Sequence, residues 1–527
     1  MSDSAVPPRA GDSDVFRAEA DEPCPPRRRP WVLAAAVLGS TMAAVDGTVV
    51  NIALPALQQD LGATLVKLQW VVEAYALLLG ALILTGGAAG DRFGRRRIFG
   101  AGTLVFALAS LWCGLAPDMT QLIIARGLQG VGAALLVPGS LSIISAAFPK
   151  AERGRAIGTW SAFTALAMAL GPLLGGWLID NASWRWIFFI NLPLAGVVLW
   201  VLRVYVPESR DRGVGRTDWW GSALAVIGLG GIVLGLIEGS RLGFAAPSSW
   251  PALAVGVVAL VGFVAVEARL RTPMLPLGLF RSGDFAGANI LTILLYASLG
   301  GLIFFFPFVL IQAHGYSATG AGAAFLPLIV LILVMSRWSG GLVVRVGGRL
   351  PLVIGPLIAA VGFGLFALPN DGVYWQSFFP ATVVLGIGMA IVVAPLTTVV
   401  MTSLNEDQAG LASGVNNAAA RIAALLAIAG FGVLFTATFD AGLTQGVEAL
   451  SLQPDAQIAI LNQLGRLAAV DLTGVGDADT QGAVRSAISA ALVDGFRAVA
   501  VVAALLAALS AAAAAVMIGG RPAPLKR

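Results

Sequence analysis

The sequence predicts an all-α, polytopic membrane protein with fourteen spans, on the grounds of its composition, its apolar runs and the distribution of its charges. Of its 527 residues, 57% are hydrophobic and 12% are charged, with a mean hydropathy of +0.85. A soluble globular domain carries about 25% charged residues. This composition excludes a water-soluble enzyme, a nucleic-acid-binding protein and a fibrous protein, although the net charge is +4.

Fourteen apolar runs are long enough to cross a bilayer, since about 20 mostly apolar residues span the ~30 Å hydrocarbon layer. The predicted spans cover approximately 31–55, 69–90, 98–116, 119–141, 156–179, 185–206, 218–238, 250–268, 286–311, 320–344, 351–368, 375–401, 409–438 and 496–518. Residues 1–30 are polar and rich in proline, which predicts a disordered tail. The first apolar run is too long for a cleaved signal peptide, so we count it as a span.

Basic residues lie almost entirely on one side of the predicted spans. If the N-terminus is cytoplasmic, 25 of the 33 Lys and Arg residues fall in cytoplasmic segments and five in outer segments. Because basic residues concentrate on the cytoplasmic side of a membrane, both termini are predicted to lie inside. Residues 439–495, which contain many acidic residues, are then predicted to form an extracytoplasmic loop.

The chain contains an internal repeat at an offset of about 256 residues. Small residues at 154–158 recur at 410–414, and the two glycines at 130–132 recur at 386–388. The offset leaves room for two spans between the repeats, and repeated halves with a site between them are typical of transporters. The predicted units are a tail, a six-helix bundle, a two-helix insert, a second six-helix bundle and a second tail, at 1–30, 31–210, 211–270, 271–518 and 519–527.

Four motifs indicate a family. The stretch 87–95, Gly-Ala-Ala-Gly-Asp-Arg-Phe-Gly-Arg, follows the second span and resembles motif A of the major facilitator superfamily. The stretch 171–176, Gly-Pro-Leu-Leu-Gly-Gly, resembles motif C, the antiporter motif. The stretches 46–55 and 126–132 resemble the first-span motif and motif B of the 14-span drug:proton antiporters. The resemblance covers about 30–517 and implies a major facilitator fold of two six-helix bundles plus two extra helices.

The resemblance also implies roles for motifs A and C. Motif A is expected to latch the two bundles together on the cytoplasmic side while the outer side is open; its residues are Gly87, Asp91, Arg92, Gly94 and Arg95. Motif C is expected to close the path for proton leak, because its glycines allow a close helix approach and its proline bends the helix; its residues are Gly171, Pro172, Gly175 and Gly176. The alternatives are that the arginines of motif A only set topology and that the glycines of motif C only serve general packing.

Asp46, Glu73 and Arg126 are the candidate proton-coupling residues. All three fall in the outer half of the predicted spans. An ionised side chain at the bilayer centre costs roughly 2.5–3.5 kcal/mol. Such acids persist when they bind protons, face a cavity or find a partner, and an arginine beside an acid changes its proton affinity. The alternatives are that each acid only hydrogen-bonds a neighbouring helix and that Arg126 forms a static ion pair.

Aromatic residues in the fifth and ninth spans are candidates for the wall of a substrate cavity, where they would stack on a cation. The set is Trp160, Phe163, Tyr296 and Phe304. The alternative is that they face lipid, as most aromatic residues in a membrane protein do.

These observations predict a proton-coupled antiporter that exports amphipathic, cationic drugs or toxic compounds across the bacterial cytoplasmic membrane. The alternative is an exporter or flippase of a lipid or endogenous metabolite that uses the same coupling. An intramembrane enzyme is disfavoured because the sequence offers no catalytic grouping around its single histidine, and nutrient uptake is disfavoured by motif C. The proton gradient replaces a cofactor, since no phosphate-binding loop occurs. The predicted partners are substrate, protons and membrane lipid, without nucleic acid, and a monomer suffices.

Overall fold

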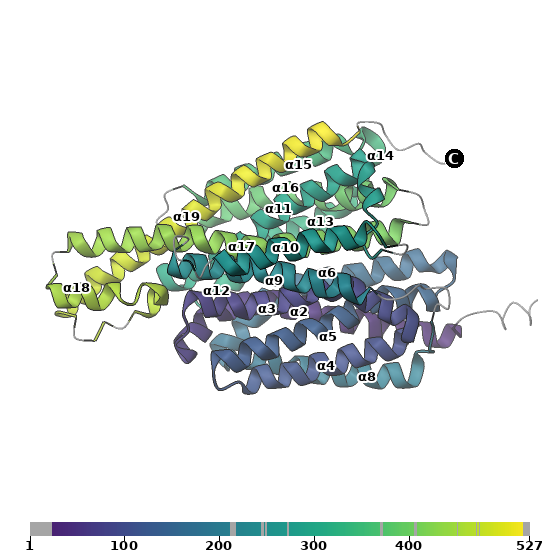
Figure 1. Ribbon diagram of the computed structural model, residues 1–527, viewed down its shortest axis with the longest axis horizontal. Helices are drawn as coiled ribbons and strands as arrows, with labels where there is room; N and C mark the ends of the chain where they lie inside the picture. Colours follow the sequence, from purple (N-terminus) through teal and green to yellow (C-terminus); the bar gives the residue numbers. More distant parts are fainter. Residues whose placement is uncertain are drawn as a thin grey trace, which may run out of the picture.

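The computed structural model describes residues 24–210, 218–243, 247, 250–270, 273–368, 373–404, 408–450, 452–470, 472–473 and 475–519. In these ranges the regular elements are helices (Figure 1). Fourteen of them are long and apolar enough to cross a membrane, which confirms the predicted number of spans. The N-terminal half forms a first bundle, two helices form an insert, and the C-terminal part forms a second bundle.

The first bundle contains six long helices in antiparallel succession. A short 3-10 turn, η1 (Pro26–Arg28), precedes them, and the four-residue α7 (Trp186–Phe189) introduces the last. The long helices are α2 (Arg29–Leu61), α3 (Leu65–Phe93), α4 (Arg95–Leu115), α5 (Met119–Ala147), α6 (Lys150–Asn181) and α8 (Asn191–Tyr205). Helix α5 packs extensively on both α3 and α4.

The close contacts of α5 depend on its glycines. A Cβ atom on Gly130 would lie 2.5 Å from the Tyr75 carbonyl oxygen of α3, and one on Gly132 would lie 2.6 Å from the Phe106 nitrogen of α4. Both distances are too short for any side chain. Glycine at these two positions therefore sets the spacing of three helices.

The insert consists of α9 (Trp219–Leu242) and α10 (Trp250–Glu267), which pack on each other. Helix α9 also contacts α3 of the first bundle and α17 of the second. Exposed tryptophans stand at the helix starts, at Trp219, Trp220 and Trp250, as expected for aromatic residues at a membrane–water interface.

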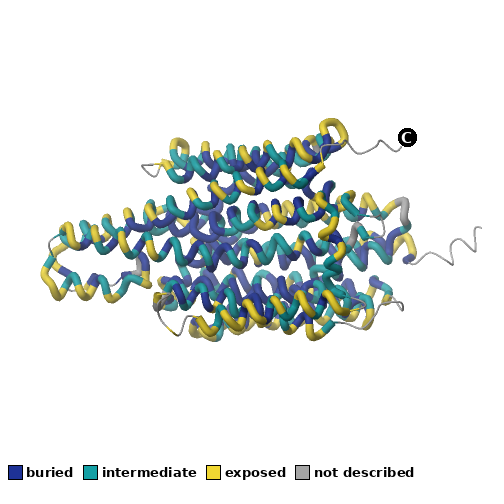
Figure 2. The backbone as a smooth tube through the Cα atoms, turned by 45° about the horizontal axis from the view of Figure 1, so that its top comes forward, coloured by how far each residue is buried: buried dark blue, intermediate teal, exposed yellow. Residues whose placement is uncertain are grey.

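The second bundle repeats the six-helix plan with more interruptions. Its elements before the last pair are η2 (Leu277–Arg281), α11 (Gly283–Phe308), η3 (Val309–Ala313), α12 (Ala318–Ala323), α13 (Leu326–Gly340), α14 (Leu342–Val346), α15 (Arg349–Phe366), η4 (Tyr374–Phe378) and α16 (Phe379–Thr402). The last pair is α17 (Ala409–Ala449) and α19 (Ala478–Met517), with α18 (Pro454–Leu461) and η6 (Leu464–Ala469) between them. Buried residues run through the centre of both bundles (Figure 2).

The two ends of the molecule differ. Figure 1 shows the start of α2 and the end of α19 at one side, which we call the terminal end, and α18 at the opposite side, which we call the hairpin end. Helices α17 and α19 contain 41 and 40 residues, or about 60 Å each at 1.5 Å per residue, whereas the hydrocarbon layer is ~30 Å thick. They therefore extend well past the other helices into the segment 439–495, where the sequence predicted a loop.

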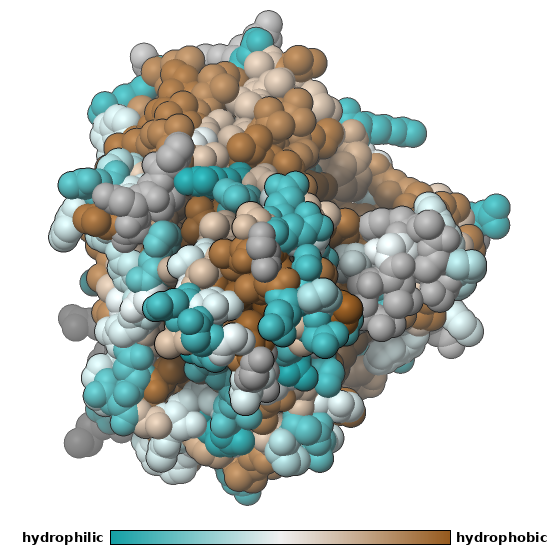
Figure 3. All heavy atoms as spheres, turned by 90° about the vertical axis from the view of Figure 1, so that its left-hand side faces the viewer, coloured by the Kyte–Doolittle hydropathy of each residue, from teal (hydrophilic) through white to brown (hydrophobic). Residues whose placement is uncertain are grey.

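Small residues hold this projecting hairpin together. A Cβ on Gly442 would lie 3.4 Å from the Ala491 Cβ, and one on Gly446 would lie 3.0 Å from the Ala487 Cβ, so α17 and α19 pack closely. Asp477 caps α19 by accepting hydrogen bonds from the hydroxyl and backbone N–H of Thr480, and these bonds lower the pKa of Asp477. Seen from the hairpin end, hydrophilic side chains stand beside broad hydrophobic surfaces (Figure 3).

Candidate functional site

A buried polar network occupies the centre of the first bundle, around Asp46 of α2. The Asp46 carboxylate is fully buried and forms an ion pair with Arg126 of α5. It also accepts hydrogen bonds from Gln129 Nε2 at 3.0 Å and from Asn191 Nδ2 of α8 at 3.3 Å. Residues of three helices, α2, α5 and α8, therefore meet at this single carboxylate.

Arg126 is as completely enclosed as its partner, with 1% of its surface exposed. Its Nε donates to the Val71 carbonyl oxygen of α3 at 3.0 Å, and its Nη1 donates to Gln129 Oε1 at 2.7 Å. The guanidinium also lies over the Tyr75 ring, 4.3 Å from its centroid. Because Gly130 holds α5 against the backbone of Tyr75, the glycines of motif B place the arginine in this position.

Uncharged residues complete the network. Gln129 Nε2 donates to Ser110 Oγ of α4 at 2.7 Å, and the Cys113 thiol of α4 donates to Gln129 Oε1 at 3.4 Å. The network thus reaches α2, α3, α4, α5 and α8. The sequence placed Asp46 and Arg126 at a comparable depth in the membrane, and the structure brings them into contact. The sequence did not single out Ser110, Gln129 or Asn191 as partners. A buried pair of this kind is costly to break, since removing one partner destabilises by about 3–5 kcal/mol.

Glu73 of α3 lies apart from this network, at the contact between the two bundles. Its side chain is fully buried, and neither carboxylate oxygen has a hydrogen bond in the described part of the chain. Its carboxylate lies close to the backbone of Ala429 in α17. One turn earlier, Gln69 Nε2 donates to the Ile428 carbonyl oxygen at 3.1 Å, so this part of α3 packs directly on the second bundle.

Arg421 of α17 lies two turns from this acid along the same contact. A Cβ on Gly80 of α3 would lie 3.9 Å from the Arg421 Cβ. The Arg421 Nε is buried without a hydrogen-bond partner. Among the described residues, no ion pair is recorded between Glu73 and Arg421. The contact between the bundles therefore holds an acid and a base that do not satisfy each other.

Motif C lies where the two bundles meet at the hairpin end. A Cβ on Gly171 or Gly175 would collide with Thr48 or Val49 of α2, respectively. A Cβ on Gly176 would collide with the Ala318 carbonyl oxygen of α12, in the second bundle. The glycines of motif C thus let α6 pack closely on α2 of its own bundle and on α12 of the second bundle.

Residues of α12 and an acid of α6 also hold the contact between the two bundles closed. A Cβ on Gly322 of α12 would collide with the Pro172 carbonyl oxygen. Asp180 of α6 accepts hydrogen bonds from the Ala318 N–H at 3.1 Å and from the Thr319 N–H at 2.8 Å. Backbone packing and a carboxylate cap together hold α6 and α12 at the hairpin end.

Toward the terminal end, α6 is largely exposed, and the residues of α13 range from half-buried to exposed. Between Glu152 and Leu170, only Ala156 and Ala169 are buried, and Phe163 is 54% exposed. In α13, no residue whose burial is described between 329 and 338 is buried. A tight contact between α6 and α13 along this stretch would leave a buried stripe on both helices, whereas the two helices have few contacts with each other. The bundles are therefore closed along α6 at the hairpin end and separated along it at the terminal end.

Motif A forms contacts within the first bundle. The Arg95 guanidinium donates to the Asp91 carboxylate at 2.8 Å, and the Arg95 N–H donates to the Ser209 carbonyl oxygen. Gly94 has φ +113°, a value that side-chain-bearing residues rarely adopt. A Cβ on Gly87 would lie 3.5 Å from Pro138 of α5. The contacts recorded for Asp91 do not include the second bundle, so the latch stays a prediction.

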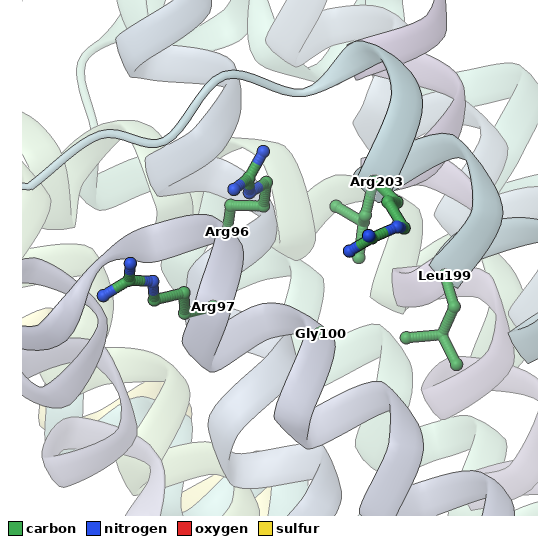
Figure 4. A pocket seen from close by; sticks show the side chains of 6 residues that line it. Arg96, Arg97, Gly100, Leu199 and Arg203 are labelled. Carbon is green, nitrogen blue, oxygen red and sulfur yellow. The ribbon is translucent and has the colours of Figure 1, made fainter.

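A basic cavity adjoins motif A. It has a volume of about 480 Å³ and is lined by Arg96, Arg97, Gly100, Leu199, Leu202 and Arg203, between α4 and α8 (Figure 4). Glu208 partly neutralises it, because its carboxylate lies 3.8 Å from Arg96 Nε and 3.7 Å from Arg97 Nε. Arg92, which motif A also contains, lies over the Phe93 ring.

The four aromatic candidates occupy different environments. Trp160 Nε1 donates to Ser40 Oγ of α2 at 2.9 Å, and Phe163, on the same helix, is exposed beside the separated region. Tyr296 is half-buried against the core of the second bundle. Phe304 is fully buried and packs on Phe305 with ring centroids 4.8 Å apart. Their contribution to a substrate cavity stays a prediction, with Phe163 placed most openly.

Comparisons with known proteins by sequence and by structure point to the same group of proteins. Residues 36–428 match the Major Facilitator Superfamily. The chain is 34% identical to the multidrug resistance protein Stp of Mycobacterium tuberculosis, over 79% of this chain and 78% of that protein. It is 35% identical to the tetracenomycin C resistance and export protein of Streptomyces glaucescens (77% and 76% covered) and 37% identical to the puromycin resistance protein pur8 of Streptomyces alboniger (77% and 81%).

Solved structures show the same fold at lower identity. A bacterial homologue of the human lysosomal transporter Spinster, in an inward-facing and unoccupied conformation, matches with a TM-score of 0.66 at 19% identity, over 95% of this chain and all of that one. The Escherichia coli xylose transporter XylE, in an inward-open conformation, matches with a TM-score of 0.54 at 15% identity, over 94% and 97%. The protein is a multi-pass membrane protein and a transporter rather than an enzyme: it belongs to the major facilitator superfamily.

Proposed function

We propose that the protein is a proton-coupled antiporter that exports amphipathic, cationic drugs or toxic compounds across the bacterial cytoplasmic membrane. The names of its relatives, which include a multidrug resistance protein and a tetracenomycin C export protein, support drug efflux. The concentration of basic residues at the terminal end supports a cytoplasmic location for both termini. The hairpin end then faces outward.

The observation that carries the proposal is the Asp46–Arg126 pair inside the first bundle. When Asp46 is ionised, it holds Arg126, Gln129 and Asn191 in one arrangement. A proton on Asp46 removes the charge that Arg126 faces, and a buried arginine without a counter-charge favours another arrangement of α2 and α5. Proton binding therefore selects between two packings of the bundle, which is what coupling requires.

The packing between the bundles supplies the second part of a transport cycle. With α6 and α12 closed at the hairpin end and α6 separated from α13 at the terminal end, a compound from the cytoplasm would reach exposed apolar residues such as Phe163. Protonation of Asp46 changes the position of α2, and Gly171 and Gly175 pack on that helix. The closed contact at motif C is thus mechanically connected to the proton site.

One or two protons per transported molecule supply enough free energy to drive efflux against a concentration gradient. Each pH unit of gradient supplies about 1.4 kcal/mol per proton, and each 100 mV of membrane potential adds about 2.3 kcal/mol per charge moved. No nucleotide is required.

The test is substrate-induced proton movement with purified protein in liposomes, measured with a pH-sensitive dye after addition of a lipophilic cation. We expect the wild type to exchange cation for protons and Asp46→Asn to lose this exchange. Asp60→Asn is the matched control, since Asp60 is on the same helix but is about half exposed and pairs with Arg185 at 2.9 Å. Normal exchange by Asp46→Asn would refute the proposal. Movement of a labelled phospholipid, with no response to the cation, would instead support the lipid exporter.

A further inference from the structure

Two acidic residues meet at the terminal end of the two-helix insert. Asp218 caps the start of α9, and Glu267 is the last residue of α10. Their carboxyl groups lie close together beside Gly221 of α9. A Cβ on Gly221 would collide with Asp218 Oδ2 and would lie 2.9 Å from Glu267 Oε1, so the missing side chain at Gly221 leaves room for both oxygens.

In each acid, one carboxylate oxygen accepts a backbone hydrogen bond and the other accepts none. Asp218 Oδ1 accepts from the Gly221 N–H at 2.9 Å, and Glu267 Oε2 accepts from the Leu275 N–H at 2.9 Å. The remaining oxygens, Asp218 Oδ2 and Glu267 Oε1, are buried and receive no hydrogen bond from any described donor. Only 2% of Glu267 is exposed. Two buried acceptor oxygens therefore lie near each other without a described donor between them.

Among the residues that the structure describes, no basic side chain forms an ion pair with either acid. In the described ranges, Asp218 is the only titratable side chain recorded against Glu267. From α3 the nearby polar group is the Thr85 hydroxyl, which hydrogen-bonds to Ser222 of α9. From the segment before α11 the groups are the backbone of Leu275 and the Met274 thioether, which lies 3.6 Å from Ser222 Oγ. Two ionised carboxylates this close repel each other, which disfavours the state in which both are charged.

From this geometry we infer that Asp218 and Glu267 form a second proton-binding site, which holds one proton shared between the two acids. The shared proton converts the repulsive contact into a short O–H···O⁻ hydrogen bond, the strong charge-assisted type. This goes beyond the proposed function, which assigns no role to the insert.

The position of the pair gives the proton a structural consequence. Glu267 holds Leu275, in the segment that leads into α11 of the second bundle. Ser222, which donates to the Asp218 carbonyl oxygen at 2.7 Å, bonds with Thr85 of the first bundle. The acid pair therefore joins the insert to both bundles. Loss of the proton leaves two like charges in contact, which separates the start of α9 from the end of α10.

Infrared spectroscopy of the full-length protein in lipid nanodiscs tests this directly. We expect a carboxylic-acid C=O stretch at neutral pH that disappears at alkaline pH. Glu267→Gln and Asp218→Asn should each remove this signal, because the new amide N–H replaces the proton as the bridging donor and preserves the contact. Asp46→Asn is the matched control and should keep the signal. Since that control leaves the insert untouched, failure of the proton coupling at Asp46 is separable from failure here.

Thermal unfolding provides the second measurement. The wild type should lose thermal stability as the pH rises through the loss of the shared proton, whereas Glu267→Gln should not lose stability over that range. The same scans are repeated with sodium, magnesium or a chelator at constant pH. The inference is overturned if the infrared signal survives in both single variants. It is also overturned if stability follows the added cation instead of the pH, because a metal ion would then occupy the space between the acids.

Discussion

The two bundles share a helical plan, but their centres are filled differently. The first is built around an ion pair, Asp46 with Arg126, enclosed by amide and hydroxyl groups. The second is built around phenylalanine rings, and Phe306 alone contacts four others, Phe325, Phe366, Phe378 and Phe496. Its buried polar contacts are weaker, as where Asn416 donates to Asn289 and Thr292.

This difference separates two tasks. A close-packed aromatic core resists rearrangement, because its contacts are lost together when it shifts. An ion pair has a second stable state, since a proton removes one of its charges. We therefore expect the first bundle to respond to protons and the second to move against it as a rigid body. The following variants challenge that division, in order of decreasing effect.

Arg126→Ala should have the largest effect. It leaves the Asp46 carboxylate buried without a counter-charge, which lowers the free energy of unfolding by about 3–5 kcal/mol and abolishes efflux. Thermal unfolding of the purified protein checks the first expectation, and cation transport in liposomes checks the second. Adding Asp46→Asn should restore most of the stability without restoring efflux. If the double variant were as unstable as the single one, the ion pair would not be the cause.

Phe306→Leu should destabilise less, by roughly 1–3 kcal/mol, because the core keeps an apolar side chain but loses ring packing. Thermal unfolding measured across a pH series should show the same pH dependence as the wild type, displaced to lower temperature. A changed pH profile would show that the second bundle also responds to protons, and would break the comparison between the bundles.

Gly322→Ala tests how the bundles meet. The added methyl group would collide with the Pro172 carbonyl oxygen, so we expect a strain of roughly 1–3 kcal/mol that opens the hairpin end. Spin labels on the exposed residues Asn181 and Trp375 would report a longer distance. Gly364→Ala is the control, since a Cβ there meets no atom within 4 Å. Equal distances in both variants would contradict a closed contact at motif C.

Asn416→Ala should have the smallest effect. It removes two side-chain hydrogen bonds in the second bundle, each of which contributes about 1 kcal/mol in typical cases, and it leaves no charge unpaired. Proton exchange in liposomes should match the wild type. Loss of exchange with a normally folded protein would place proton coupling in the second bundle as well.

The sequence predicted the fold closely because its signals are local. Apolar length and charge asymmetry define spans without reference to their neighbours, so the number of spans is confirmed. The meeting of Asp46 with Arg126 was also within reach, since charges inside spans are rare and seek each other. Gln129 and Asn191 were not identified as partners, because a single amide in an apolar run carries no comparable cost.

Other features depend on which helix faces meet. That Glu73 lies against α17 rather than beside Asp46, and that Phe304 lies in a closed aromatic core, follow from tertiary packing. The continuation of α17 to Ala449 was hidden for another reason. Once a helix leaves the hydrocarbon layer its hydropathy falls, so a count of apolar residues marks the end of the span and not the end of the helix.

The length of α17 has a mechanical consequence. One helix passes from the terminal end, beside Leu84 of α3, to the projecting tip at the hairpin end. Where the hairpin meets the first bundle, the Arg466 carbonyl oxygen accepts a hydrogen bond from Gln58 at 2.8 Å, on the helix that carries Asp46. If the second bundle tilts during transport, the tip moves farther than the rest of the bundle, so we expect a reporter fixed to the tip to follow the transport cycle.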